Sequence, residues 1–541
     1  MSPGPQNEPA GIPRPASGAE QSDKRPALKE SAETSQVFVR ESTGLVKSAS
    51  FLDATALNLG NMSVGAALAN IGFTTILLQS MVGVNLVIGS LIGFAITIPE
   101  IVVYSYMNQR VPRTGGDYIW VSRVFGGLFG SSISFMGYTL ETLAYLALIT
   151  LSAVTAIGAV GFSLGYSGLL SLSIPGAAPL AQFGVGVLVF GSIIAVNIFR
   201  PRAGFKLVTA LIGIGVAATL IAIATLLLAG RTGVENYMST LVSAGYSSSY
   251  ASLAGSYHGP EFSWAATIAI LPFFAIFTYP WLNASPAVAG ELRGNRSFKW
   301  AVPLASLIVV SLVTLSFGVM YYVGGFGFTN AALANSQLVV NYGFNFWTLA
   351  MGVSSSPILS FIIGLGWIVF ELGILAYGVI VFSRYLFAQA FDRFLPTKLA
   401  YVSPRFGSPV VAHVIDFVIT IGLVGGAAFL YGSISQLYGA VAASMIYFIV
   451  IGIAAAVYAI RRESGGSRRV LAVAGVAMAA AFAFLTYQFF SAYQVWGGNL
   501  LSYGYVAASF VAGLVIYSAS KAYHKKRGVD IELAYKEIPP E

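Results

Sequence analysis

Long apolar stretches recur along most of the chain, and the short segments between them hold most of the charged residues. An apolar stretch of about 20 residues is long enough to cross a lipid bilayer as a helix. The pattern therefore predicts twelve membrane-spanning helices after a polar N-terminal segment. The expected spans are 51–74, 80–107, 127–158, 180–199, 205–229, 264–288, 301–323, 357–389, 409–430, 434–459, 470–492 and 500–520.

Composition supports this interpretation. Of the 541 residues, 56% are hydrophobic and 9% are charged, against about 25% charged residues in ordinary soluble domains. A soluble protein is therefore excluded, and we expect an all-α integral membrane protein in contact with the lipid bilayer. The chain has no cysteine and three histidines, so we expect no metal site, and we expect no cofactor.

The distribution of basic residues predicts the orientation. The chain has 29 Lys and Arg, and all but Arg231 fall in the N-terminal segment, in alternate loops or the span ends beside them, or in the C-terminal segment. Loops rich in Lys and Arg stay on the cytoplasmic side of a membrane. We therefore expect a multi-pass protein of the cell membrane with both termini cytoplasmic. The net charge of +8 then reflects membrane orientation, and we expect no nucleic-acid partner.

The segments outside the spans differ in character. Residues 1–47 are rich in proline and mixed charge, which predicts a disordered cytoplasmic tail, and 521–541 form a second cytoplasmic tail. The loops 231–263 and 324–356 are long, rich in Ser, Gly, Asn and Tyr, and expected outside, where short lid helices would fit.

The loop after the second span carries the first motif. Pro112 ends the helix, Gly115 and Gly116 allow a tight turn, and Tyr118 anchors a short interfacial stretch that includes Arg123. This string resembles the P-x-x-G-G-x-Y signature of the amino acid, polyamine and organocation (APC) permease superfamily.

A second motif follows the eighth span. Residues 383–396 read SRYLFAQAFDRFLP, beginning with Ser383 and Arg384 and containing Asp392 and Arg393. This segment resembles S-R-x-x-x-A-x-x-R-D-G-x-x-P of the same superfamily. We interpret its Arg-Asp order as reversed, with Phe394 in place of the glycine. The two motifs together identify the chain as an APC-type permease from about Ser42 to at least Tyr431.

The resemblance implies a LeuT-type fold. In it a transporter core, 48–460, holds helices 1–10 as two inverted repeats of five helices, about 51–229 and 264–459, and helices 11 and 12 follow within 470–520. The first helix of each repeat should be interrupted at its centre. Helices 1 and 6 do carry glycines or prolines there. The expected substrate-binding residues are Gly60, Asn61, Met62, Ser63, Val64, Gly65, Phe277, Thr278, Tyr279, Pro280 and Trp281.

A broken helix exposes N–H groups at one end and C=O groups at the other, so a zwitterion can bind without a charged side chain. We therefore expect a secondary active amino acid transporter working by alternating access, and not an enzyme. A polyamine, a nucleobase or another organic cation is the alternative substrate. From another class, a substrate sensor or a channel on the same fold is the alternative function.

Four acids fall inside the predicted spans, where each needs a structural or functional reason: Glu100, Glu141, Glu371 and Asp416. Glu371 is the first candidate for ion coupling, because the family fold places helix 8 against the break in helix 1, and Glu141 is the second. The alternative for each is a neutral acid that bonds a neighbouring helix. Asp416 is expected to pair locally with His413.

The expected coupling ion is the proton, with uncoupled exchange as the alternative, so the protein would be a symporter or an antiporter. Within 373–380, the stretch of helix 8 expected to face the break, Tyr377 carries the one hydroxyl, and this argues against a sodium site. The chain also lacks a nucleotide-binding glycine motif, so ATP is not the expected energy source.

Overall fold

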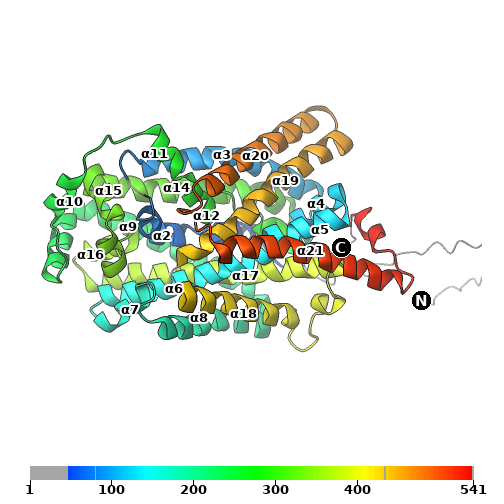
Figure 1. The fold of residues 1–541 in the computed structure, drawn as a ribbon, viewed down its shortest axis with the longest axis horizontal. Helices are drawn as coiled ribbons and strands as arrows, with labels where there is room; N and C mark the ends of the chain where they lie inside the picture. The colour runs from blue at the N-terminus through cyan, green and yellow to red at the C-terminus, as the bar shows by residue number, and fades with distance from the viewer. Residues whose placement is uncertain (1–46, 79–80, 432–433, 539–541) are drawn as a thin grey trace, which may run out of the picture. The chain divides into compact units, whose positions relative to one another are not determined.

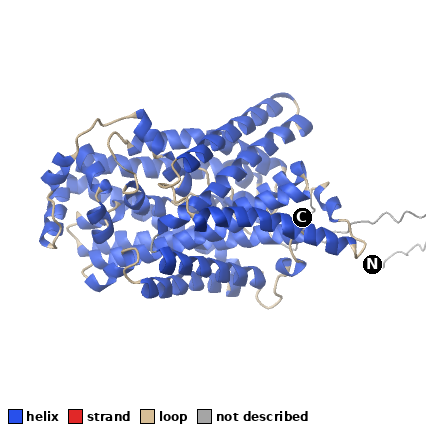
Figure 2. Ribbon diagram, viewed as in Figure 1, coloured by secondary structure: helices blue, strands red, loops and turns tan. Residues whose placement is uncertain are grey.

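The computed structural model describes residues 47–78, 81–431 and 434–538, without the side chains of 201–202 and 431–436. Regular structure in these residues is helical, as Figure 2 shows, and the one strand-like contact is an isolated parallel bridge between Ala49 and Leu292. The expected disordered tail, 1–47, lies outside the described residues except for Lys47, whose carbonyl accepts a hydrogen bond from Arg293 Nε at 2.8 Å.

Ten helical segments in the described part of the chain are long and apolar enough to cross a membrane. This confirms an all-helical integral membrane fold. The spans are α3 (Leu86–Arg110), the continuous segment α5–η1–α6 (Gly127–Ser163), α8 (Pro179–Phe199), α9 (Pro201–Ser243), α14 (Asn295–Gly324), α17 (Pro357–Phe391), α18 (Val410–Gly425) with η6 (Gly426–Tyr431), η7 (Ile434–Val441) with α19 (Ala442–Arg462), α20 (Gly465–Ser491) and α21 (Leu500–Lys525).

The other two predicted spans, 51–74 and 264–288, are each divided into shorter helices. The first consists of α1 (Phe51–Asn61) and α2 (Val64–Thr75), separated by Met62 and Ser63. The second consists of α11 (Trp264–Ala269) and α12 (Leu271–Phe277), followed by irregular chain and α13 (Ala284–Ala287). Twelve spans and the inverted repeat remain a prediction, since they require each broken pair to count as one span.

Local sequence explains where these elements begin and end. Ser50 caps α1 through a capping box with Asp53, and Pro280 cannot supply the N–H that would continue α12. The span predicted over 205–229 ends where Gly230 leaves helical geometry, with φ 59° and ψ −161°. The helix then resumes to Ser243, so 231–243 is helical rather than the loop we expected.

The short helices lie at the two ends of the bundle. Figure 1 shows α10 (Tyr250–Ser256), α15 (Phe326–Ala334) and α16 (Phe346–Gly352) at one end, so both predicted outer loops contain helices. At the other end lies α4 (Asp117–Phe125), with η8 (Ile531–Tyr535) beyond α21. The remaining short elements are α7 (Leu170–Ser173), η2 (Ser167–Leu169), η3 (Ala289–Glu291), η4 (Gln337–Asn341) and η5 (Thr397–Ala400).

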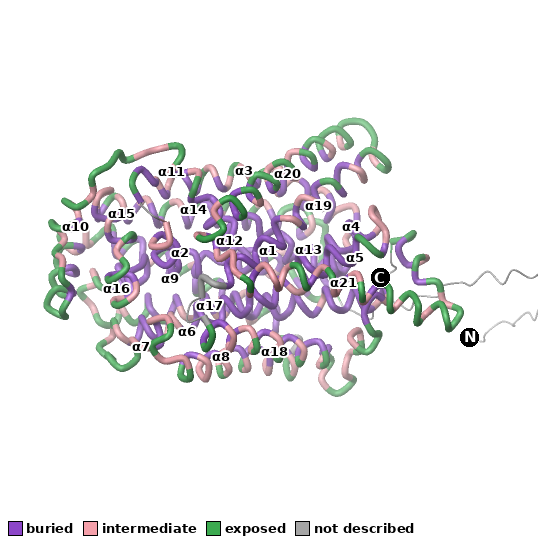
Figure 3. The backbone as a smooth tube through the Cα atoms, viewed as in Figure 1, coloured by how far each residue is buried: buried purple, intermediate pink, exposed green. Residues whose placement is uncertain are grey.

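The broken helices lie in the buried interior, as Figure 3 shows. The first contacts α6, α9, α14 and α17, and the second contacts α2, α3 and α17. By contrast, α8 and α18 pack side by side and expose large apolar side chains such as Leu188 and Val418. This arrangement places the two irregular segments among long, regular helices, which is the setting that non-helical backbone requires inside a membrane.

Candidate functional site

The break between α1 and α2 centres on Ser63, whose φ of 33° lies in the left-handed region. Its hydroxyl donates backward to the carbonyls of Gly60 and Asn61, both at 3.1 Å. The N-terminus of α2 receives no hydrogen bond from its N-cap side chain. Because the first N–H groups of a helix lack intrahelical partners and carry partial positive charge, this end of α2 suits an anionic group.

The break after α12 is closed on itself by a tryptophan. The Trp281 indole N–H donates to the carbonyls of Ala275 at 3.0 Å and Ile276 at 2.9 Å, in the last turn of the helix. Thr278 likewise donates to the Phe274 carbonyl at 2.9 Å. The carbonyls of Ala275 and Ile276 thus already have a donor, so the expected binding of a substrate ammonium by carbonyls at this break would fall to its other carbonyls.

Two polar contacts join the breaks to each other. Asn61 Nδ2 donates to Asn283 Oδ1 at 2.9 Å, and Asn58 Nδ2 donates to Ser285 Oγ at 2.8 Å. The Ser285 backbone N–H returns a bond to Asn58 Oδ1 at 3.0 Å. Of these four residues only Asn61 was predicted. Asparagine amides within apolar spans were the available signal, because a buried amide needs hydrogen-bond partners.

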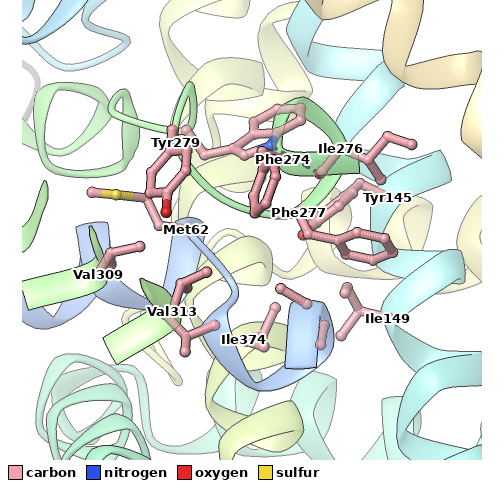
Figure 4. Close-up of a cluster of buried hydrophobic side chains, with 14 of the residues drawn as sticks. Met62, Tyr145, Ile149, Phe274, Ile276, Phe277, Tyr279, Val309, Val313 and Ile374 are labelled. Atoms are coloured by element: carbon pink, nitrogen blue, oxygen red, sulfur yellow. Dashed lines mark hydrogen bonds between the residues drawn. The ribbon is translucent and has the colours of Figure 1, made fainter. Parts of the chain in front are cut away.

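Aromatic residues of α6 and α17 complete the walls. Tyr145 OH donates to Ser63 Oγ, and Tyr377 OH donates to Asn61 Oδ1, both at 2.7 Å. The Tyr145 ring also stacks on Trp281, with centroids 5.2 Å apart. Figure 4 shows an apolar cluster here whose labelled members come from both breaks, α6, α14 and α17: Met62, Tyr145, Ile149, Phe274, Ile276, Phe277, Tyr279, Val309, Val313 and Ile374.

All residues of 60–65 and 277–281 are buried, but they do not all face one space. Tyr279 bonds through its hydroxyl to Ser90 of α3. Gly60 and Gly65, which have no side chain, instead allow α17 to pack closely against the first break. A Cβ on Gly60 would lie 2.8 Å from Tyr377 Cδ1, and one on Gly65 would lie 2.9 Å from Phe370 Cγ. The structure therefore brings Asn61 next to Asn283 and directs the Tyr279 hydroxyl toward α3.

Glu371 lies on α17 directly after Phe370 and is fully buried. Its Oε1 accepts from the Trp367 indole at 3.2 Å, and its Oε2 has no hydrogen-bond partner among the described residues. The Trp367 ring stacks on Trp347 of α16, which donates to the Gly65 carbonyl at 3.1 Å. The acid is thus linked through two indoles to the backbone of the first break.

Glu141 begins α6, directly after the π-helical turn η1 (Phe135–Leu140). It is buried, and neither carboxyl oxygen has a partner in the described part of the chain. The expected local pair of His413 and Asp416 is not formed. Asp416 Oδ1 accepts instead from Thr420 at 3.1 Å, one helical turn farther on, and His413 Nδ1 has no partner among the described residues.

The two sequence motifs meet at the α4 end of the bundle. Arg123 forms a bidentate ion pair with Asp392, with Nη2 to Oδ1 at 2.8 Å, and Tyr118 OH donates to Asp392 Oδ2 at 2.8 Å. Desolvation by itself would lower the pKa of Arg123, but the adjacent Asp392 carboxylate raises it, and the guanidinium stays charged. Residues 269 positions apart thus fasten α4 to the end of α17.

The glycine turn of the first motif packs against the chain that follows the second break. Gly115 N–H donates to the Ala287 carbonyl at 2.8 Å, and a Cβ on Gly116 would lie 2.8 Å from the Pro286 backbone. Both glycines have positive φ, at 89° and 44°. Pro112 precedes this turn, after Val111 has closed α3.

Arg384 of the second motif contacts the same region. Its guanidinium forms a bidentate pair with Glu291, at 2.7 and 3.0 Å, and it also donates to the Ser383 hydroxyl at 2.9 Å. The Glu291 carbonyl accepts from the N–H groups of Ser48 and Ala49. Glu291 was not predicted, because its role depends on contacts with both the N-terminal segment and α17.

The interpretation of the second motif needs correction at Arg393. This residue has φ 60°, the left-handed geometry that favours glycine, whereas Phe394 is buried and not in that region. Counting from Ser383 to the proline that ends the motif places Asp392 at the family aspartate and Arg393 at the family glycine. The acid–base order is therefore not reversed.

Sequence reasoning missed Asp117, the first residue of α4. Three phenols donate to its buried carboxylate: Tyr104 and Tyr385 at 2.7 Å, and Tyr447 at 3.1 Å. They come from α3, α17 and α19, and we call them the tyrosine cage. Burial raises the pKa of Asp117 to about 6, against the opposite effect of the phenols. The signal available in the sequence was the negative charge of Asp117, since the charged residues of the surrounding loop are otherwise basic.

Two broken helices in contact inside an all-helical membrane bundle are a feature of many membrane transporters. Comparison with known families agrees. Residues 50–517 match the amino acid permease family, and the chain belongs to that family. It is therefore a multi-pass membrane transporter with a small-molecule amino acid substrate, rather than an enzyme.

Two relatives show the range of similarity. The serine/threonine exchanger SteT of Bacillus subtilis (strain 168) is 24% identical over 442 residues, which cover 80% of this chain and 87% of the exchanger. Uncharacterized protein 399 of Sulfolobus islandicus rod-shaped virus 1 is 31% identical over 90 residues, covering 17% of this chain and 22% of that protein.

Proposed function

We propose that this permease is a secondary active transporter that binds a small amino acid between the breaks of α1/α2 and α12/α13 and moves it by alternating access. The observation that carries the proposal is the direct contact of the two breaks through Asn61 and Asn283. The substrate carboxylate binds at the uncapped N-terminus of α2. The substrate ammonium binds backbone carbonyls of the irregular segment after α12 other than those of Ala275 and Ile276, which accept hydrogen bonds from Trp281.

The walls favour a small side chain over a long or charged one. Met62, Ile149, Phe277 and Ile374 surround the breaks with apolar surface, while Ser63 and Tyr145 supply hydroxyls. A polyamine has no anionic group for the α2 terminus, so this substrate class, like a nucleobase, fits the site less well. The name of the exchanger relative supports serine and threonine as the first substrates to test.

We further propose that the α4 end of the bundle faces the cytoplasm, with twelve spans and the 5+5 inverted repeat. Proton coupling runs through Glu371 first and Glu141 second. Glu371 is favoured because Trp367 and Trp347 connect it to Gly65, whereas Glu141 has no described hydrogen bond toward either break. Exchange without a coupling ion is the alternative.

Uptake of labelled L-serine into proteoliposomes loaded with unlabelled amino acids tests this function. We expect saturable, stereoselective uptake that requires internal amino acid or a proton gradient and is unaffected by a sodium gradient. A panel of putrescine, uracil and D-serine as competitors tests the substrate class. Uptake that depends on sodium and ignores pH contradicts the coupling, and ionic current without saturable uptake indicates a channel.

A further inference from the structure

The tyrosine cage is a junction between elements on both sides of the proposed transport path. Asp117 is fully buried and accepts bonds from α3, α17 and α19, and Asn283 of the second break lies beside it. Through Asn283 the cage continues to Asn61 in the first break. A change in the cage therefore acts on the helices that must separate when this end opens.

Of the described groups that face Asp117, the three phenols donate hydrogen bonds, and none carries a compensating positive charge. These groups are the three phenols, the Tyr138 ring of η1, the Asn283 amide and Glu100, which precedes Tyr104 by one turn on α3. Glu100 is buried, and neither of its oxygens has a partner among the described residues. On α4 itself, Arg123 is paired with Asp392.

These surroundings favour the neutral form of a carboxyl group more than water does. Burial disfavours its charge, a second acid stands nearby, and the phenols compensate only in part. We propose that Asp117 is a proton-binding residue of the gate at the α4 end, which closes more firmly when Asp117 is protonated and opens more readily when it is ionised. This rests on the proposed function in taking the protein to alternate between closed and open gates.

The direction follows from proton linkage. In the closed arrangement the pKa of Asp117 is about 6, above the value of about 3.9 that a hydrated aspartate has. The closed gate therefore binds the proton more tightly than an open gate in which Asp117 meets water. Lowering the pH through about 6 stabilises the closed gate, and raising the pH favours opening. Acidification on this side would thus slow release of substrate.

The absence of cysteine allows a direct measurement. An Ala284→Cys variant places one thiol on α13, at a site that is fully buried in the closed arrangement. Its rate of labelling by a maleimide, divided by the rate for an exposed Ser239→Cys reference, reports opening of the gate without the pH dependence of the thiol itself. The purified full-length protein in lipid nanodiscs is labelled at pH 5.5 and pH 7.5, without substrate.

We expect the normalised rate to be about fourfold higher at pH 7.5, the ratio of ionised fractions for a pKa of about 6. Adding Asp117→Asn, which mimics the protonated acid, should give slow labelling at both pH values. Adding Tyr447→Phe removes one donor to the carboxylate, so the midpoint should move to higher pH. This second variant keeps the test decisive if Asp117→Asn fails to fold.

Equal normalised rates at both pH values would overturn the proposal, as would an unchanged pH dependence in Asp117→Asn or an unmoved midpoint in Tyr447→Phe. Labelling requires no substrate, so serine binding is measured separately by thermal shift. Absent serine binding with intact pH-dependent labelling refutes the proposed substrate alone, and the reverse result refutes the role of Asp117 alone.

Discussion

The Phe370 side chain of α17 lies against two glycines, Gly65 of the first broken helix and Gly215 of α9. A Cβ on Gly65 would approach Phe370 Cγ to 2.9 Å, and one on Gly215 would approach it to 2.3 Å. Both glycines therefore leave the space that the Phe370 side chain occupies, next to Glu371 in the chain. The packing of the Phe370 side chain against these glycines therefore determines how closely α17 approaches the proposed substrate site.

Gly65→Ala should accordingly impair transport. The added methyl must displace Phe370, and overpacking of this kind costs about 1–3 kcal/mol. We expect uptake to fall by about tenfold or more, with partial recovery in the Gly65→Ala/Phe370→Leu double variant. Gly213→Ala is the matched control, because nothing lies within 4 Å of its Cβ position on α9. Equal uptake by the Gly65 and Gly213 variants would contradict this packing.

Asn61 and Tyr377 should be energetically coupled, because the Tyr377 phenol donates to Asn61 Oδ1 at 2.7 Å in a buried setting. A double-mutant cycle of Asn61→Ala and Tyr377→Phe, measured by denaturant unfolding in micelles, should give a coupling free energy of about 0.6 kcal/mol or more. Strict additivity would show that the bond contributes nothing to the folded state.

The buried ion pair of Arg123 and Asp392 should matter far more than an exposed pair. Asp392→Asn leaves the Arg123 charge buried, and breaking such pairs costs about 3–5 kcal/mol, so we expect a large loss of thermal stability. Glu532→Gln is the control, since it removes the partner of Lys521 at an exposed site and should change the melting temperature little. Similar shifts for both variants would rule out the fastening role of Asp392.

Glu371→Gln and Glu141→Gln should separate coupling from binding. If Glu371 carries the proton, Glu371→Gln loses proton-driven accumulation of serine yet still exchanges internal for external substrate. Glu141→Gln should retain accumulation, because no described hydrogen bond links Glu141 to either break. Comparison of gradient-driven uptake with counterflow checks both variants, and the opposite outcome would transfer the coupling role to Glu141.

Periodicity and motifs predicted the parts of this structure that depend on local sequence. Apolar stretches located the spans, and Gly and Pro in 60–65 and 277–281 located the two breaks. Proton coupling and the site itself remain predictions. The family glycine of the second motif was assigned to Phe394, one residue too far, because a non-glycine residue, Arg393, has the left-handed geometry that favours glycine.

Contacts between distant residues could not be predicted from one sequence. Asn283, Glu291 and Asp117 each acquire a partner when residues 222, 93 and 268 positions away come next to them in the fold. Trp281 shows a different limit. It was expected to line the site, and its indole turns back to the last carbonyls of α12, a direction that residue type alone does not reveal.

The parallel bridge between Ala49 and Leu292 has a mechanical consequence. It ties the start of the first broken helix to the chain after the second, and Asn61 and Asn283 tie their centres. Two attachment points restrain hinging of one broken helix against the other. The two broken helices should therefore tilt together as one rigid unit. A change of access would then require this unit to slide along its contacts with α6 and α17.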